Sequence, residues 1–111
     1  MIPIRRPAKG SPLLIPEQSE ADFQRQVIAY AELNHWKIYH TFRSDRSAPG
    51  FPDIVAVRER CVWIELKRVG GKLRPEQEEW RDALISAGQS WYCLTPDMWD
   101  EIERIFAREA A

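Results

Sequence analysis

A pair of opposite charges closes an apolar run near the middle of the chain. From Cys61 onward, an expected strand alternates its side chains between two faces, so Glu65 and Lys67 share the face of Trp63. Charges on a core strand are costly to bury unless they are paired with each other or coordinate a metal. Glu65 and Lys67 are therefore either an ordinary ion pair at a strand end or part of an active site.

A second carboxylate, that of Asp53, comes directly before another short apolar run, and residues 58–60 join the two runs as a hairpin. An odd number of loop residues places Asp53 opposite Glu65 or Lys67, on their face of the sheet. A two-residue turn places Asp53 opposite Leu66 and points it away. Asp53 could also be only a turn residue, because Asp is disfavoured in strands. A shared site therefore requires an odd loop, a bulge or a bend at Asp53.

Two further polar side chains lie on or above the apolar stripes of expected helices. Glu20 follows a helix cap at Ser19, where the helix dipole favours a carboxylate, and it also stands above the stripe that begins with Phe23. Gln77 shares the stripe of Trp80 in a second expected helix. It could satisfy a buried backbone group, or it could orient a nucleophile or a phosphate. Both residues are candidates for the same site.

Two carboxylates on adjacent strands supply hard oxygen ligands. Asp53 and Glu65, together with a backbone carbonyl such as that of Leu66, suit an octahedral Mg²⁺ or Mn²⁺ ion that keeps several waters. Such an ion polarises a phosphoryl oxygen and makes bound water more acidic. Lys67 could orient the attacking water or stabilise developing negative charge, and Glu20 could bind a water, a second ion or Lys67. With no His, Ser or Cys placed as a nucleophile, the set outlines phosphodiester hydrolysis.

Basic residues flank the expected site on both sides. The formal net charge of −1 conceals an uneven distribution. Residues 1–74 contain 13 Lys and Arg against 8 Asp and Glu, whereas residues 75–111 contain 3 against 9. Loops rich in Lys and Arg suit phosphate contacts, which position DNA without reading its sequence. The candidate DNA-binding residues in the two flanking loops are Arg43, Arg46, Arg68, Lys72 and Arg74.

Hydrophobic periodicity predicts an α/β sandwich with the element order α-β-β-β-α-β-α and a central mixed sheet covered by helices on both faces. The expected elements are helices over residues 20–35, 76–87 and 96–108 and strands over residues 37–42, 53–57, 61–67 and 90–94. The prolines near the start predict an extended, basic arm over residues 1–17. Residues 18–111 then form the folded domain.

The length and composition limit the class of protein. A chain of 111 residues forms one domain, and no stretch approaches the roughly 20 apolar residues of a membrane span. We expect no membrane partner. Cys61 and Cys93 each lie inside an apolar run and are expected to be buried, reduced thiols. Such thiols are typical of cytoplasmic proteins.

These residues resemble a known pattern. Gly50-Phe51-Pro52-Asp53, followed by Glu65-Leu66-Lys67, resembles the PD-(D/E)XK nuclease signature. More narrowly, the chain resembles the VRR-NUC family. The similar segments are Ser19-Glu20, Gln26 to Ala31, Trp36 to His40, Ser47 to Asp53, Glu65 to Lys67, Gly71-Lys72-Leu73, Pro75-Glu76-Gln77 with Trp80, and Ala87-Gly88.

The resemblance implies a restriction-endonuclease-like fold and an Mg²⁺- or Mn²⁺-dependent nuclease. The positions that match the family's site are Glu20, Asp53, Glu65, Lys67 and Gln77. Small stand-alone members, often encoded by phages, are similar to Holliday junction resolvases and act as homodimers. The resemblance therefore implies an endonuclease that resolves four-way DNA junctions, in the cytoplasm of a bacterium or of a phage-infected host cell.

Three alternatives stay open at this level. A nuclease of the same fold could act on flaps or on nicked or intact duplex DNA instead of junctions. A catalytically silent module could bind nucleic acid without cutting it, although such a module should have lost Asp53, Glu65 or Lys67. An unrelated α/β protein could use these charges as structural ion pairs, and an even hairpin loop would favour that reading.

Overall fold

A computed structural model describes residues 19–41 and 46–107 of the chain. The predicted arm over residues 1–17 and the candidate Arg43 lie outside these ranges. The elements follow the predicted order, with helices and strands alternating as α-β-β-β-α-β-α. They are α1 (Glu20–Leu33), β1 (Lys37–His40), β2 (Ile54–Val57), β3 (Cys61–Leu66), α2 (Pro75–Ser86), β4 (Ser90–Leu94) and α3 (Trp99–Phe106).

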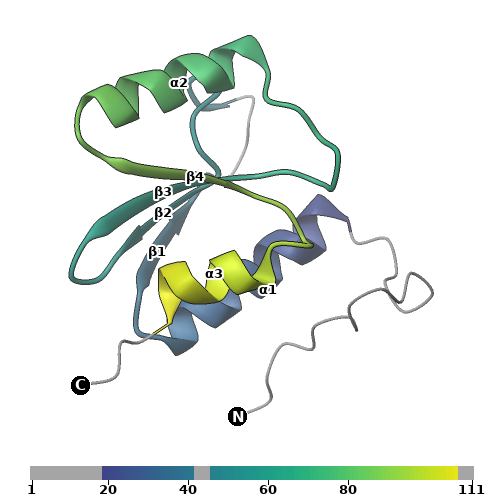
Figure 1. Ribbon diagram of the computed structural model, residues 1–111, viewed down its shortest axis with the longest axis vertical. Helices are drawn as coiled ribbons and strands as arrows, with labels where there is room; N and C mark the ends of the chain where they lie inside the picture. The colour runs from purple at the N-terminus through teal and green to yellow at the C-terminus, as the bar shows by residue number, and fades with distance from the viewer. Residues whose placement is uncertain (1–18, 42–45, 108–111) are drawn as a thin grey trace.

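The four strands form one mixed sheet in the order β1-β2-β3-β4. The first three strands pair antiparallel, whereas β3 and β4 pair parallel and are joined through α2. Helices α1 and α3 lie together on one face of the sheet, and α2 lies on the other (Figure 1). The predicted sandwich with a central mixed sheet is therefore confirmed.

The hydrophobic core lies between the sheet and the α1–α3 layer, because alternate strand residues point there. On β2, Ile54 and Ala56 are fully buried, while Val57 on the opposite face is exposed. In β3 and in the two helices, too, the buried residues lie on one apolar face of each element. They are Val62, Ile64 and Leu66 from β3, Phe23, Val27 and Ala31 from α1, and Trp99, Ile102, Ile105 and Phe106 from α3.

Helix α1 starts where the sequence predicts. The hydroxyl of Ser19 accepts a hydrogen bond from the Asp22 backbone N–H at 3.0 Å, which satisfies one of the free donors of the first turn. Phe23 of the same helix contacts Trp99 of α3 edge-to-face, with ring centroids 6.4 Å apart. The cap and this contact fix the end of α1 that lies nearest the candidate site.

Two arginines at the tip of the β2–β3 hairpin have structural partners. Arg58 donates to the backbone carbonyl of Asn34 at 3.0 Å, and Arg60 donates to that of Ile105 at 3.1 Å. Both guanidinium groups also lie over the Trp36 ring, at 4.7 and 5.7 Å from its centroid. These contacts satisfy carbonyls near the ends of α1 and α3, far from the open end of the hairpin.

Three details differ from the sequence-based expectations. The apolar residues of β4 predict a buried strand, but β4 is an edge strand in which only Leu94 is buried. Helix α3 begins at Trp99 and not at Pro96, since a turn closed by the Met98 N–H and the Thr95 carbonyl (2.9 Å) comes first. Cys61 and Cys93 are unbridged as expected but only half-buried, because both face the α2 side of the sheet.

Among the described helices, none has the length and apolarity needed to cross a membrane.

Candidate active site

The hairpin between β2 and β3 has the odd loop that a shared site requires. Val57 pairs with Cys61, so three residues, 58–60, form the loop. The register Ile54↔Ile64 therefore continues to Asp53 opposite Glu65. The Asp53 carboxylate accepts a hydrogen bond from the Leu66 backbone N–H at 2.8 Å, so it leans across to β3. The two acids lie side by side where β2 begins and β3 ends.

Helix α2 contacts Glu65 through the side chain of Gln77. The Gln77 side-chain amide donates to Oε2 of Glu65 at 2.7 Å, and its carbonyl oxygen accepts from the Arg74 backbone N–H at 2.8 Å. Glu65 and Gln77 are the only buried polar side chains found in the described residues. Gln77 therefore satisfies a backbone N–H, as one of its two interpretations predicts, and it also binds the carboxyl group of Glu65; a role in orienting a nucleophile or a phosphate stays a prediction.

The two carboxyl groups oppose each other electrostatically. Burial, followed by the neighbouring charge of Asp53, raises the pKa of Glu65 to about 8. Burial also raises the pKa of Asp53, against the lowering effect of the Leu66 N–H. A hydrogen bond joins the two carboxyl groups when one of them is protonated. The pair therefore binds a proton unusually tightly and is poorly compensated by protein cations.

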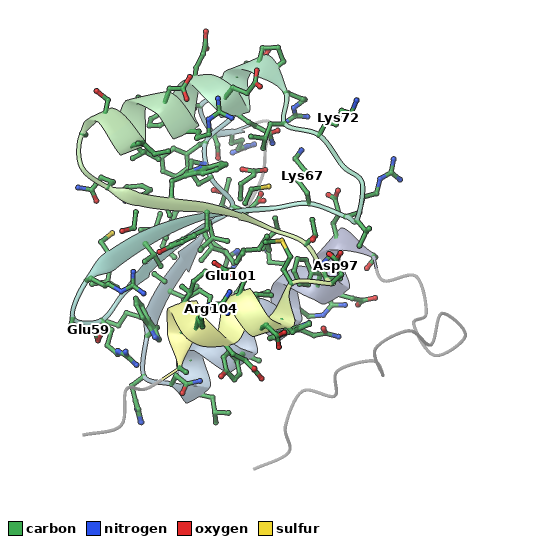
Figure 2. The ribbon with its side chains drawn as sticks, viewed as in Figure 1. Glu59, Lys67, Lys72, Asp97, Glu101 and Arg104 are labelled. Atoms are coloured by element: carbon green, nitrogen blue, oxygen red, sulfur yellow. The ribbon has the colours of Figure 1, made fainter. Side chains whose placement is uncertain are left out.

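Lys67 follows directly at the end of β3. Its backbone N–H donates to the Leu94 carbonyl at 2.9 Å, which extends the β3–β4 pairing by one residue. The half-buried side chain projects to the α2 side of the sheet, and Lys72 of the β3–α2 connection lies on that side as well (Figure 2). The charge of Lys67 lowers the pKa of both Asp53 and Glu65, although less than burial raises them.

The donor set fits a hard divalent cation. Asp53 and Glu65 offer carboxylate oxygens whose mutual repulsion a cation would relieve. The Leu66 backbone lies beside Asp53, and its carbonyl as a third ligand stays a prediction. In residues 19–41 and 46–107, no three Asp, Glu, His or Cys side chains gather as a metal cluster. A cation there would complete its shell with water or substrate oxygens, as Mg²⁺ does.

Glu20 lies at the margin of this arrangement. It is exposed at the first position of α1, and its charge contributes to the raised pKa of Asp53. The described residues contain no three-acid cluster that would include it with Asp53 and Glu65. The structure thus brings Asp53, Glu65, Lys67 and Gln77 together and leaves Glu20 beside them.

The candidate DNA-binding residues lie on the connections around the site. Arg46, Arg68, Lys72 and Arg74 are all exposed. Arg74 also lies near enough to Glu65 for its charge to lower the pKa of that carboxyl, against the larger effect of burial. The connection from Lys67 to Arg74 therefore has positively charged side chains that begin beside the acids and continue at the exposed surface.

Sequence reasoning did not assign a role to residues 49–51, which come shortly before Asp53, and it did not place Cys93 beside the acids. Cys93 pairs with Glu65 in the parallel β3–β4 register, and burial, followed by the charge of Glu65, raises the pKa of its thiol. Side-chain alternation predicts that Cys93 and Trp91 share one face of β4. The sequence of β4 does not show which strand it pairs with or in which register, so the position of Cys93 beside Glu65 could not be predicted.

Comparison with known proteins supports the fold. A solved structure described as a VRR_NUC domain matches with a TM-score of 0.65 and 16% sequence identity, covering 80% of this chain and 97% of that one. No family model and no curated protein matches the sequence. This chain therefore shares the fold of a VRR_NUC domain, and the resemblance in the sequence is confirmed at the level of the fold.

Proposed function

We propose that the protein is an Mg²⁺- or Mn²⁺-dependent endodeoxyribonuclease that cuts branched DNA, four-way junctions above all, as a homodimer. The observation that carries the proposal is the placement of Asp53 opposite Glu65, two residues before Lys67, in a VRR_NUC-like fold. One buried and one half-buried acid, both with raised pKa values, and one lysine form a set that ordinary core packing does not need.

Each side chain has a chemical task in this proposal. Asp53 and Glu65 would hold the cation, which when bound polarises a phosphoryl oxygen and acidifies water. Lys67 would orient the attacking water and neutralise charge that develops on the phosphate. Gln77 would keep Glu65 turned toward Asp53 through the 2.7 Å hydrogen bond. Glu20, at the margin, would bind a water molecule next to Asp53.

The positive connection around the site supports DNA as the substrate. Exposed Arg68, Lys72 and Arg74 follow Lys67 along one connection, and Arg46 lies on the loop that leads to Asp53. Such contacts to phosphates provide affinity for any DNA sequence, and shape then decides which DNA is cut. Arg43, outside the described residues, stays a candidate for the same kind of contact from the sequence alone.

The number of DNA strands that must be cut supports a homodimer. One chain provides one Asp53–Glu65 pair, and one such pair cuts one strand. Resolution of a four-way junction requires paired cuts in two strands, so two chains related by a two-fold axis would match the symmetry of the substrate.

The test compares a labelled four-way junction with a linear duplex of the same sequence, each with Mg²⁺, Mn²⁺ or EDTA. We expect paired, metal-dependent nicks in the junction alone, and none with Glu65→Ala. Glu59→Ala is the matched control, because Glu59 is an exposed acid at the far end of the same hairpin (Figure 2).

The other outcomes separate the alternatives. Cutting of both substrates would retain the nuclease and remove the preference for junctions. Cutting that persists in EDTA or in the Glu65→Ala variant would overturn the site. Tight binding to the junction without cutting under any condition would point to a silent DNA-binding module.

A further inference from the structure

The loop before Asp53 touches the backbone of α2 at a point where no side chain fits. Gly50 has a φ of +81°, and a Cβ atom built on it would lie 2.3 Å from the Glu76 carbonyl carbon and 2.7 Å from the Gln77 nitrogen. These two atoms form the peptide bond that carries Gln77. Any residue larger than glycine would therefore have to push the first turn of α2 away from the loop.

Aromatic contacts hold the same two segments together. The Trp80 indole N–H of α2 donates to the Pro49 carbonyl at 3.1 Å. The Phe51 ring packs edge-to-face against Trp80, with ring centroids 5.0 Å apart, and against Trp63 of β3 at 6.0 Å. The Phe51 ring therefore contacts both α2 and the sheet, while the Pro49 carbonyl is bonded to α2.

Each of the two segments is connected to one of the acids, the loop through the chain and the helix through a hydrogen bond. On the loop side, the Pro52 carbonyl accepts from the Thr41 hydroxyl at 2.9 Å, and the next residue is Asp53. On the helix side, the peptide that touches Gly50 belongs to Gln77, whose amide holds Glu65. A shift between loop and helix would therefore separate the support of Glu65 from the position of Asp53.

We propose that Gly50 is a positioning residue: its close contact with the Glu76–Gln77 peptide bond sets the Gln77–Glu65 pair against Asp53 in the geometry that a divalent cation requires. The inference rests on the metal site of the proposed function. It assigns to Gly50 a task in that site, which it performs through Gln77 and without contact to metal or substrate.

The chain offers a matched control for backbone strain. Gly88 has a φ of +82°, and a Cβ atom there would meet nothing within 4 Å. Alanine at either position has to adopt the same left-handed conformation, but only at Gly50 does it collide with backbone. The comparison of Gly50→Ala with Gly88→Ala therefore isolates the contact with α2 from the general cost of the substitution.

Two measurements on the full chain test the proposal, both taken below the unfolding midpoints of the variants. One is the Mn²⁺ dissociation constant, measured by calorimetry. The other is hydrogen exchange of the Gln77 side-chain amide, measured by ¹⁵N NMR without metal. We expect Gly88→Ala to match the unaltered protein in both. Gly50→Ala should weaken Mn²⁺ binding about 10- to 100-fold, as loss of support to a metal ligand does, and should speed the amide exchange.

Equal Mn²⁺ affinity and equal amide protection in the two alanine variants would overturn the inference. If the unaltered protein binds no Mn²⁺, the proposed function fails, and amide protection of Gln77 decides by itself whether Gly50 positions the pair.

A second pair of variants covers the case in which Gly50→Ala does not fold. Trp80→Phe retains an aromatic ring beside Phe51 and removes the hydrogen bond to Pro49, whereas Trp36→Phe removes an indole hydrogen bond to the Phe106 carbonyl (2.9 Å), near the tip of the β2–β3 hairpin. Weaker Mn²⁺ binding in Trp80→Phe alone would support the coupling of loop and helix. The same change in both variants, or in neither, would contradict it.

Discussion

The side chain of Gln77 joins the main chain at the start of α2 to the buried carboxyl group of Glu65. Its amide nitrogen lies 2.7 Å from Glu65 Oε2, and its oxygen lies 2.8 Å from the Arg74 nitrogen. A glutamine fits this place because it alone among uncharged side chains of this length both donates and accepts. The position of the helix and the direction of the carboxyl group are therefore linked through one residue.

Replacing Gln77 should cost stability as well as activity. Gln77→Ala leaves the Arg74 N–H and the Glu65 carboxyl without their partner, and we expect the free energy of unfolding in urea to fall by about 1–3 kcal/mol. Gln89→Ala is the control, because exposed Gln89 accepts a single bond from Trp63 and should lose about 0.5 kcal/mol or less. Equal losses of unfolding free energy in the two variants would show that the hydrogen bonds of Gln77 stabilise the fold no more than the exposed bond of Gln89 does.

The raised pKa values predict how stability depends on pH. The pKa of Glu65 is about 8 in the folded chain against an ordinary 4.5, so the folded state binds more protons than the unfolded state between these values. The free energy of unfolding in EDTA should therefore fall as pH rises from about 5 to 8. Asp53, whose pKa is also raised, adds to the same slope.

Urea denaturation at several pH values checks this slope, with Glu65→Gln expected to flatten it. Glu59→Gln should retain it, because the pKa of Glu59 is lowered to about 2 and its titration is complete below the window. Saturating Mg²⁺ should reduce or reverse the fall, since the cation favours the ionised carboxylates. A rising slope in EDTA would contradict the raised pKa values.

Lys67 should matter to turnover more than to metal binding. Lys67→Met keeps the aliphatic stem but removes the ammonium group, and we expect junction cleavage to slow by about 10²- to 10³-fold. Its Mn²⁺ affinity should hold or rise, because the charge that opposes a cation is gone. Lys37→Met is a control on the exposed edge strand β1. A titration in which Lys67→Met loses Mn²⁺ affinity but keeps its saturated rate would remove the assigned role.

Lys72 is predicted to contact a phosphate. Lys72→Ala should weaken binding in EDTA to junctions of any sequence, and should reduce the slope of log affinity against log salt by about 1. Arg104→Ala removes the same charge from exposed Arg104 on α3, on the opposite side of the sheet (Figure 2), and should leave the slope unchanged. An identical slope for both variants would exclude a phosphate contact at Lys72.

Much of the architecture is readable from local patterns. The cap residue Ser19 predicts the start of α1, and alternation from Cys61 to Leu66 predicts a strand with one apolar face. Both were confirmed because capping and side-chain period are short-range properties. The predicted start of α3 at Pro96 was wrong, because proline fits the first turn of a helix and a β-turn equally well.

The sequence by itself determined the types and order of the elements, and it supplied the residues that could do chemistry. Only the tertiary structure decided which of them meet. The three-residue hairpin loop puts Asp53 opposite Glu65, and a change of one residue would have reversed its face. The docking of α2 on the Gly50 loop brings Gln77 to Glu65, while Glu20 stays at the margin. Local composition cannot fix such relations, because they depend on register and on the packing of segments far apart in the chain.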